Sequence, residues 1–396
     1  MVEREWQPLA PGELEQRLDQ AVEETLEAEL VARLKSQPSP TIYVHLLQSP
    51  ASLGPQVPQS TPEEELQEPR ALQPPVDGEA LKSVADLLQT SDTRVRMSGR
   101  ARLSLSNTVL LSLSLLTERV SYRTLSRRFH LEKGNIHRIF FSFCERINAL
   151  EGKLIKWPTD AEAAEVLVPL CRSGRLQEER QALPRVLGVL GHTLIPARLP
   201  AGKVDACEAK RPRKTPHPDS WLSLELVCDW RGRLRHCRVS AASDADRGRS
   251  LREKLRQHPE LMPPGSCLLA GPGYPLCAHI LTPYGESHGA KEKLFNETLE
   301  QHLRVLGGTL ASLRGRFQRL RYLDVSSFHR ARAVVLTACA LHNLFLDLGQ
   351  TQGEVEEEDE EQALGREEEG EEDVEGAERR EAVSDLLFQC LDSGTT

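Results

Sequence analysis

Residues 221–240 read WLSLELVCDWRGRLRHCRVS, and no other stretch of the chain points so directly to a class of fold. Apolar and polar residues alternate from Trp221 to Cys228 and again from Arg233 to Ser240, with the turn Asp229-Trp230-Arg231-Gly232 between them. Alternation with a period of two is typical of a half-buried β-strand. Two such runs joined by a short turn predict an antiparallel hairpin.

The segments around this hairpin predict an α/β fold with a mixed sheet flanked by helices. Upstream, Arg185 to Ile195 is an apolar run typical of a strand. Downstream, the pattern predicts in turn a helix, a short buried strand, a long arginine-rich helix and an apolar closing helix: Ser250–Gln257, Cys267–Ala270, Lys291–Leu320 and Ser326–Leu348. Strands that give way to helices in this manner indicate layers packed on one sheet.

Residues 81–158 have a helical pattern throughout. Leu105 to Leu116 is nearly continuous apolar and Ser residues, which predicts a buried helix. Ser121 is placed to cap a short helix, and His130-Leu131 is placed to turn the chain into a second one. Four apolar residues are spaced to line the inner face of that second helix: Ile136, Ile139, Phe140 and Phe143.

Helix, tight turn and helix is the layout of a helix-turn-helix, so we expect DNA contact here. The outward residues are basic or polar: Arg123, Arg127, Arg128, Lys133, Asn135, His137 and Arg138. Lys and Arg neutralise phosphates, while Asn and Arg can also read base edges. The alternative is that basic outer faces and this geometry serve packing and solubility alone.

Charge and proline content predict the remaining segments. Between Glu354 and Glu378 fifteen acidic residues face one Arg, a charge of −14, so the rest of a chain with net charge −9 carries +5. A mildly basic body with an acidic tail often accompanies a nucleic-acid partner, although such a tail also serves solubility. The predicted organisation is an amphipathic helical segment (1–36), a Pro-rich linker (37–80), a helix-turn-helix domain (81–158), an α/β domain (183–349), an acidic tail (350–380) and a short C-terminal amphipathic helix (381–396).

Other features bear on the compartment. Nine scattered cysteines without a CxxC pair are typical of reduced thiols, and we expect neither a secretory signal nor a membrane span. A basic cluster, Lys210, Arg211, Arg213 and Lys214 around a proline, fits a nuclear-import signal, with a phosphate-binding loop as the alternative. We therefore expect a nuclear protein, with the cytoplasm as a second location.

Six segments between Leu105 and Gly349 resemble the PIF/Harbinger transposases and the animal nucleases derived from them, in that family's order. They are SYRTLSRRFHLEKGNIHRI from Ser121, KWPTDAEAAE from Lys156, LVCDWRGRL from Leu226, ILTPYGE from Ile280, RGRFQRL from Arg314 and TACALHNLFLDLG from Thr337. This resemblance implies a ribonuclease-H-like fold of the acidic-triad (DDE) superfamily. It also implies a divalent metal such as Mg²⁺ in the ancestral reaction, and a Myb-like DNA-binding protein as a type of partner.

The resemblance also assigns the three catalytic carboxylates, and this chain has none of them. Gly191 in RVLGVLGHTLI stands at the first aspartate, Gly271 in LLAGPGYPL at the second, and Gly307 in RVLGGTLASLRGRF at the glutamate. Two-metal hydrolysis of a phosphodiester requires clustered carboxylates, because hard cations take oxygen ligands. We therefore expect no metal and no other cofactor, and predict a non-catalytic nuclear protein that binds DNA or chromatin.

Two alternatives remain open. The first is an interaction scaffold without a DNA role, in which the N-terminal helix, the acidic tail and AVSDLLFQCL from Ala382 bind partners. The second is a metal-dependent nuclease that uses other side chains: Asp229, Asp246, His192, Glu286, Glu292 or Glu297.

Overall fold

The computed structural model describes residues 78–90, 103–171, 183–198, 220–244, 246–285, 289–325, 327–350 and 373–392. These residues all belong to one compact unit, residues 69–396. The predicted N-terminal helix, the Pro-rich linker, the basic cluster at 210–214 and most of the acidic tail lie outside the described residues. No helix in the described ranges combines the length and the apolar character that crossing a membrane requires.

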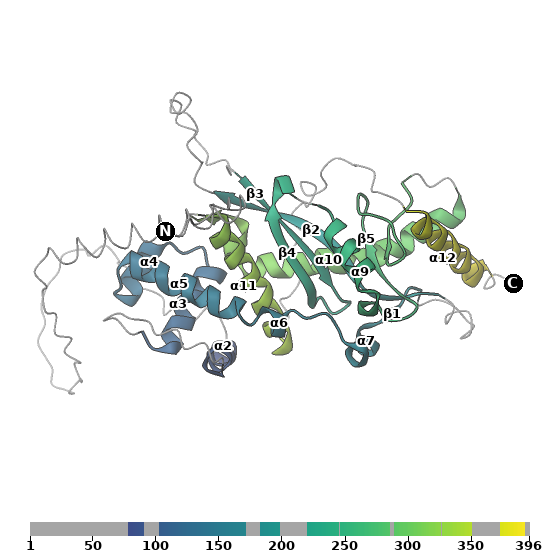
Figure 1. Ribbon diagram of the computed structural model, residues 1–396. Helices are drawn as coiled ribbons and strands as arrows, with labels where there is room; N and C mark the ends of the chain where they lie inside the picture. The colour runs from purple at the N-terminus through teal and green to yellow at the C-terminus, as the bar shows by residue number, and fades with distance from the viewer. Residues whose placement is uncertain are drawn as a thin grey trace, which may run out of the picture. The chain divides into compact units, whose positions relative to one another are not determined.

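One mixed sheet forms the centre of the unit (Figure 1). Its main path runs β4-β3-β2-β5-β6. The strands are β2 (Arg185–Arg198), β3 (Ser220–Cys228), β4 (Leu234–Ala241), β5 (Ser266–Ala270) and β6 (Ile280–Leu281), and two short strands, β1 (Val168–Pro169) and β7 (Leu323–Asp324), also pair with β2. β2, β3 and β4 are antiparallel neighbours, whereas β5 runs parallel to β2. The predicted hairpin and the buried strand after it are therefore confirmed.

Helices cover both faces of this sheet, so the mixed α/β fold predicted from the sequence is confirmed. On one face α10 (Ala290–Arg316) and α11 (Phe328–Asp347) share a hydrophobic cluster with the inward side chains of β3. On the other face α9 (Arg249–Gln257) and α7 (Asp160–Val166) pack on the opposite side chains of β2 and β5. Figure 1 shows α9 in front of the strands and α10 passing behind them. Three short 3-10 helices complete this part: Ala242–Asp244, Pro259–Leu261 and Gln318–Arg321.

The N-terminal described segment is all helical: α2 (Gly78–Thr90), α3 (Leu105–Thr117), α4 (Tyr122–Phe129), α5 (Lys133–Asn148) and α6 (Glu151–Leu154). The Ser121 hydroxyl accepts from the backbone N–H of Thr124 at 3.1 Å and caps α4. His130 ends that helix with φ of 52°, and the Leu131 N–H donates back to the Ser126 carbonyl at 3.1 Å. The predicted cap and tight turn are thus both confirmed, and the four predicted inner residues of α5 are buried.

The sequence predicts separate domains over 81–158 and 183–349, whereas the structure packs these segments together. α2 to α6 share one hydrophobic cluster with α11 and the sheet. Polar contacts reinforce it: Asn148 of α5 donates to the Ala333 carbonyl at 3.0 Å and accepts from the Thr337 hydroxyl at 3.1 Å. The closing helix α11 is apolar on nearly all sides because it is buried between α5 and β4.

The C-terminal helix α12 (Val374–Asp392) begins earlier than predicted, inside the acidic tail, and packs on the sheet side of α10. Val383 and Leu387 are buried with Phe295 in a third hydrophobic cluster. Lys291 of α10 pairs with Asp385 at 2.8 Å. The segment AVSDLLFQCL therefore buries much of its apolar side within the unit.

Candidate functional site

Two of the three glycines that the resemblance places at catalytic positions lie side by side on the sheet, and the third lies in α10, next to a residue that contacts the first. Leu190 of β2 and Ala270 of β5 are paired residues of two parallel strands. Gly191 and Gly271 are the next residues on these strands, so both follow that pair in the same direction. Gly307 lies in α10, and the neighbouring Leu306 places its side chain against Gly191. We call this place the glycine site: Gly191, Gly271 and Gly307, with Leu306 across it.

The side chain of Leu306 fills the space that a side chain at position 191 would need. A Cβ built on Gly191 overlaps the Leu306 Cδ2 atom and lies 3.2 Å from its Cγ. By contrast, a Cβ on Gly271 or Gly307 meets nothing within 4 Å. α10 continues without a break through Gly307 and Gly308, although glycine costs a helix interior about 1 kcal/mol per residue relative to alanine.

The residues at the glycine site do not fit the divalent metal of the resembled family. Mg²⁺ takes oxygen ligands, usually carboxylates and water, and this place offers glycine and leucine. Among the residues that the structure describes, no group of three or more His, Cys, Asp and Glu side chains is arranged to hold a metal ion.

Two carboxylates remain near the sheet, but on the face covered by α9. Glu225 of β3 is 4% exposed, and its Oε2 accepts from the Gly248 N–H at 2.7 Å. Asp246 accepts from the Ser250 N–H at 3.2 Å and pairs with Arg238 at 2.8 Å, so it caps the start of α9. One oxygen of each carboxylate, Glu225 Oε1 and Asp246 Oδ1, is buried without a hydrogen-bond partner. Burial, and after it the charge of Asp246, raise the pKa of Glu225 to about 7.

His192 belongs to this same face. Its Nδ1 lies 2.8 Å from the Tyr274 hydroxyl, and burial followed by the charge of Arg247 lowers its pKa. Since the neighbouring Gly191 faces α10, the alternation of β2 separates His192 from the glycine site. Of the alternative metal ligands named from the sequence, the side chains of Glu292 and Asp229 are both engaged elsewhere. Glu292 accepts from the Gly289 N–H at the start of α10, and Glu286 lies outside the described residues.

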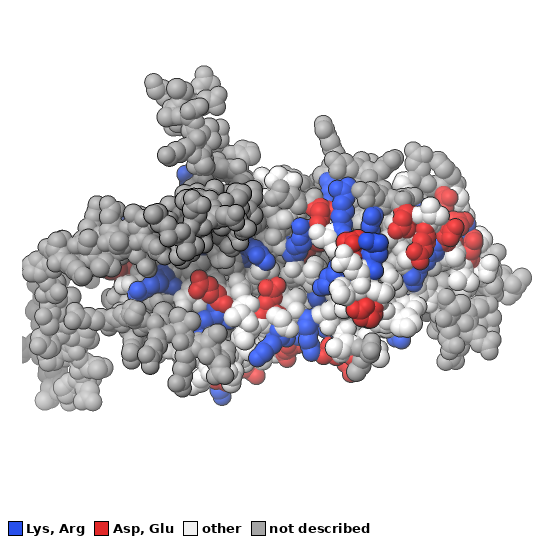
Figure 2. Space-filling model, in the orientation of Figure 1, with Lys and Arg blue, Asp and Glu red and all other residues white. Residues whose placement is uncertain are grey.

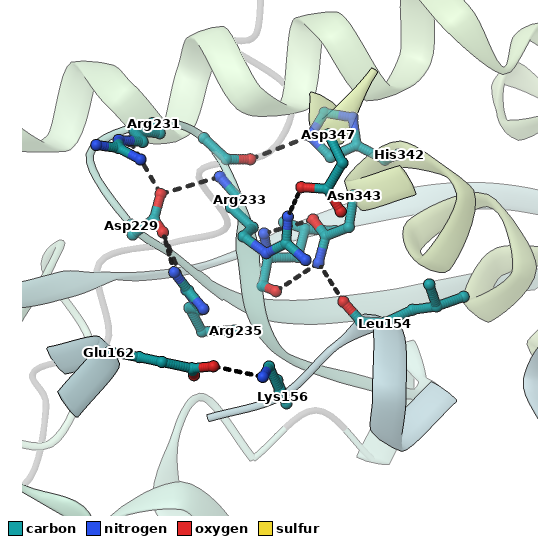
Figure 3. A network of polar contacts seen from close by, with 12 residues as sticks. Leu154, Lys156, Glu162, Asp229, Arg231, Arg233, Arg235, His342, Asn343 and Asp347 are labelled. Carbon is teal, nitrogen blue, oxygen red and sulfur yellow. Dashed lines mark hydrogen bonds and ion pairs between the residues drawn. The ribbon is translucent and has the colours of Figure 1, made fainter. Parts of the chain in front are cut away.

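Asp229 holds the β3–β4 turn (Figure 3). It is 1% exposed, and its Oδ1 accepts from the backbone N–H of Arg231 at 2.9 Å and of Arg233 at 3.1 Å. Its Oδ2 accepts from Arg235 Nε at 2.9 Å, and Arg235 forms a salt bridge with it at 2.8 Å. Both carboxylate oxygens are therefore used, so Asp229 is a turn residue and not a metal ligand.

The Leu-His-Asn element of α11 ties that turn to the helices (Figure 3). Asn343 is fully buried, accepts from the Leu234 N–H, and donates to the carbonyls of Leu234 and Leu154, each at 2.8 Å. His342 is 3.0 Å from the Gly232 carbonyl through its Nε2. We call Asp229, Arg235, His342 and Asn343 the turn network. His342 and Asn343 belong to TACALHNLFLDLG, one of the six segments that carry the resemblance, but nothing in the pattern told what they touch.

The predicted DNA-facing residues lie on α4 and the start of α5. The sequence predicts that all seven point outward, and five of them are exposed: Arg123, Arg127, Arg128, Lys133 and Arg138. Asn135 is half-buried and accepts from Arg138 at 3.2 Å. His137 is also half-buried, because its ring packs on Tyr122 and on Phe141, with centroids 5.9 and 4.6 Å apart. For His137 the outward prediction therefore needs correction, whereas it is confirmed for the five exposed side chains.

The sequence also assigns phosphate contacts to five arginines of the predicted long helix and the residue after it: Arg304, Arg314, Arg316, Arg319 and Arg321. Arg316 is buried, donates to the Gln350 carbonyl and lies over the Phe345 ring, and Arg314 donates to Thr193. Arg319 lies over the Tyr122 ring at 5.6 Å. On the face drawn in Figure 2, Lys and Arg are interleaved with Asp and Glu and do not form one continuous basic surface. The phosphate-contact role predicted for this set is therefore corrected for Arg314 and Arg316.

Comparisons with known proteins agree with this architecture. Residues 213–343 match the family model described as DDE superfamily endonuclease. No curated protein and no solved structure matches the chain. The matched range contains β3 to β7, α9, α10 and α11 as far as Asn343, and with them Gly271 and Gly307, while Gly191 precedes it. The chain thus carries a nuclease-like domain similar to the DDE superfamily, with a mixed sheet flanked by helices.

Proposed function

We propose that this chain is a PIF/Harbinger transposase-derived protein that binds DNA or chromatin in the nucleus and does not cut it. The observation that carries the proposal is the glycine site: the three positions assigned to carboxylates are all glycine, and the side chain of Leu306 occupies the space beside the first of them. A nuclease-like domain that lost its metal ligands keeps its shape, and shape with basic side chains is sufficient for binding phosphates.

The proposed contact surface is α4 and the start of α5. Arg127 and Arg128 lie in the last turn of α4, and Lys133 lies in the first turn of α5 across the tight turn. In helix-turn-helix proteins the second helix enters the major groove with its N-terminal residues toward the bases, while the first crosses the backbone. Arg138 lies one turn further along α5 and is exposed on the same helix.

Fluorescence anisotropy with a mixed-sequence duplex, measured over a range of salt concentrations, tests this proposal. The double variant Arg127→Ala plus Arg138→Ala is expected to bind more weakly, with a salt slope flatter by about one unit per lost phosphate contact. The matched control removes the same charge from α9 through Lys254→Ala plus Arg256→Ala, both of which are exposed. If both pairs of substitutions weaken binding equally, the effect is due to net charge and not to the α4–α5 surface. If the wild type does not bind the duplex at low salt, the result favours an interaction scaffold, with a Myb-like protein as the type of partner.

The absence of cutting is tested separately, by nicking of supercoiled plasmid with Mg²⁺ and with Mn²⁺. No nicking above a mock preparation is expected. Nicking that disappears in Asp246→Ala would overturn the proposal, because it would assign catalysis to the carboxylates on the α9 face of the sheet.

A further inference from the structure

A cleft of about 270 Å³ opens beside the glycine site, between the β3–β4 turn, α10 and α11. Trp230 and Arg231 of the turn form one wall, Gly308 of α10 lies on a second side, and His342 of α11 on a third. Gly308 directly follows the third glycine of the glycine site. The cleft is on a different face of α10 from Leu306, which packs on β2.

The turn presents an aromatic surface in this cleft. Trp230 is 41% exposed. The Arg231 guanidinium lies over its ring at 4.7 Å from the centroid, and Arg231 is itself exposed. The buried carboxylate of Asp229 holds the backbone beneath both residues, so this pair is rigidly supported.

The other walls combine small and polar residues with two aliphatic ones, Val305 and Leu346. Gly308 carries no side chain, and a Cβ there meets nothing within 4 Å, so the cleft exists partly because position 308 is glycine. Since His342 Nε2 is engaged with the Gly232 carbonyl, its second nitrogen, Nδ1, is a buried acceptor without a hydrogen-bond partner. No Asp or Glu is among the described residues that line the cleft, whereas Arg231 supplies a positive charge.

We propose that this cleft binds one unpaired nucleotide of single-stranded DNA, with the base stacked on Trp230 and the phosphate beside Arg231. An aromatic ring combined with a guanidinium is the arrangement that stacks bases without sequence preference. The cleft volume lies just below the range of about 300–1,000 Å³ of typical ligand pockets, which fits one nucleotide and not an extended ligand. A base also carries N–H groups, which are the kind of donor that His342 Nδ1, an acceptor without a hydrogen-bond partner, requires. The inference rests on the proposed DNA-binding function and adds a second kind of DNA contact to it.

The test compares a fluorescent single-stranded oligonucleotide with a blunt duplex of equal length, using the full chain. Trp230→Ala is expected to weaken single-strand binding between about 5-fold and 100-fold, the effect of losing one stacked base, while leaving duplex binding unchanged. Trp230→Phe keeps a ring and is expected to recover most of the affinity. Trp221→Ala removes another exposed Trp, 37% exposed and outside the cleft, and is the matched control.

A second variant reaches the cleft from the opposite wall. Gly308→Leu is expected to fill the cleft and weaken single-strand binding to a similar extent, whereas the smaller Gly308→Ala is expected to bind nearly as wild type. Both replace a helical glycine without a steric clash, so neither should unfold the protein. Circular dichroism melting of each variant checks this. Quenching of tryptophan fluorescence by the oligonucleotide, lost in Trp230→Phe, reports the stacking directly.

The outcomes separate this inference from the proposed function. Single-strand binding that is unchanged in both Trp230→Ala and Gly308→Leu overturns the inference, whatever the duplex result. Wild-type protein that binds duplex but no single strand also overturns it, and would leave the cleft to a protein partner. Single-strand binding that depends on Trp230, in a chain whose duplex binding does not depend on Arg127 and Arg138, supports the inference while the α4–α5 assignment fails.

Discussion

The glycine site and the turn network are built on the same sheet, and they differ in what they have kept. At the glycine site three positions are bare, and an apolar side chain, Leu306, lies across Gly191. At the turn network, Asn343 makes three hydrogen bonds and Asp229 uses both carboxylate oxygens, and both residues are buried. The glycine site has no polar side chain that needs a hydrogen-bond partner, whereas nearly every polar group of the turn network has one.

This difference has a thermodynamic reason. Removing one partner from a buried network leaves donors and acceptors without hydrogen bonds, at about 1–3 kcal/mol each. Carboxylates clustered for metals instead repel one another, so losing them removes an unfavourable term. Fold stability therefore constrains Asn343 and Asp229 strongly, and the side chains at positions 271 and 307, where a Cβ meets nothing within 4 Å, hardly at all. The contrast predicts large losses at the turn network and small ones at the glycine site.

The largest effect is expected from Asn343→Ala. It leaves the Leu234 N–H and the carbonyls of Leu234 and Leu154 without this partner, and the free energy of unfolding should fall by about 3 kcal/mol or more. Urea unfolding measures this loss. The control is Asp347→Ala, which breaks the nearby ion pair with Arg233 but is 51% exposed, so it should cost no more than about 1 kcal/mol. Similar losses in the two variants would break the comparison.

A pH effect comes next, from Glu225, the buried carboxylate that the fold has retained without a full set of partners. Its pKa is raised to about 7 in the folded state, so the folded state binds the proton more tightly than the unfolded one. Its contribution therefore favours the fold at low pH and is lost as the pH rises from about 4.5 through 7, by roughly 3 kcal/mol in all. Glu225→Gln should remove this dependence, and its stability relative to wild type should rise between pH 5 and pH 8.

The wild-type curve alone does not isolate that contribution. Burial lowers the pKa of His236 and of His342 to about 4. The unfolded state therefore binds the protons of these histidines more tightly, so their contribution to the stability of the fold is lost as the pH falls, opposite to that of Glu225. The measurement is thus the difference between Glu225→Gln and wild type, from denaturant unfolding at each pH. A difference that stays constant with pH would show that Glu225 is not a strained carboxylate. Stabilisation of the wild type by Mn²⁺, absent in the variant, would make the α9 face a metal site.

The smallest effect is expected at the glycine site. Gly191→Asp introduces a side chain where Leu306 already lies, so we expect a loss of about 1–3 kcal/mol from overpacking. Adding Leu306→Ala should relieve most of the clash, which a double-mutant cycle in thermal or urea unfolding measures as coupling between the two positions. Gly307→Ala, which meets nothing within 4 Å, is the control and should stabilise the helix. If the effects of Gly191→Asp and Leu306→Ala on the free energy of unfolding simply add, Gly191 and Leu306 do not contact each other.

The pattern of residues predicted those parts of the molecule that depend on contacts between near neighbours in the chain. Alternation gave the β3–β4 hairpin, and helical spacing gave α3, α4 and α5 with the Ser121 cap and the His130 turn. Each depends on contacts within a few residues of the chain, and such contacts leave a readable period. The exposed arginines of α4 were predictable for the same reason, as the face opposite Leu125.

The partners of polar side chains were not predictable in this way. Arg314 and Arg316 have the composition of a phosphate-binding helix, yet they bond to β2 and to the end of α11. His137 has the spacing of an outward residue, yet it packs on Tyr122. Glu225 looked like the polar half of an alternating strand, but α9 covers that face of the sheet. In each case an element distant in sequence decides the environment.

By itself the sequence determined the class of fold, the order of its elements and the identity of three residues that cannot ligate a metal, because alternation, helical spacing and a missing side chain are properties of the chain. Only the tertiary structure decided that Gly191 and Gly271 directly follow a pair of residues on neighbouring strands, that Leu306 lies across Gly191, and that Trp230 meets Gly308 and His342 around one cleft. Several of these contacts join residues that are more than a hundred positions apart in the sequence. They follow from how the helices pack on the sheet, and no local period in the sequence records that packing.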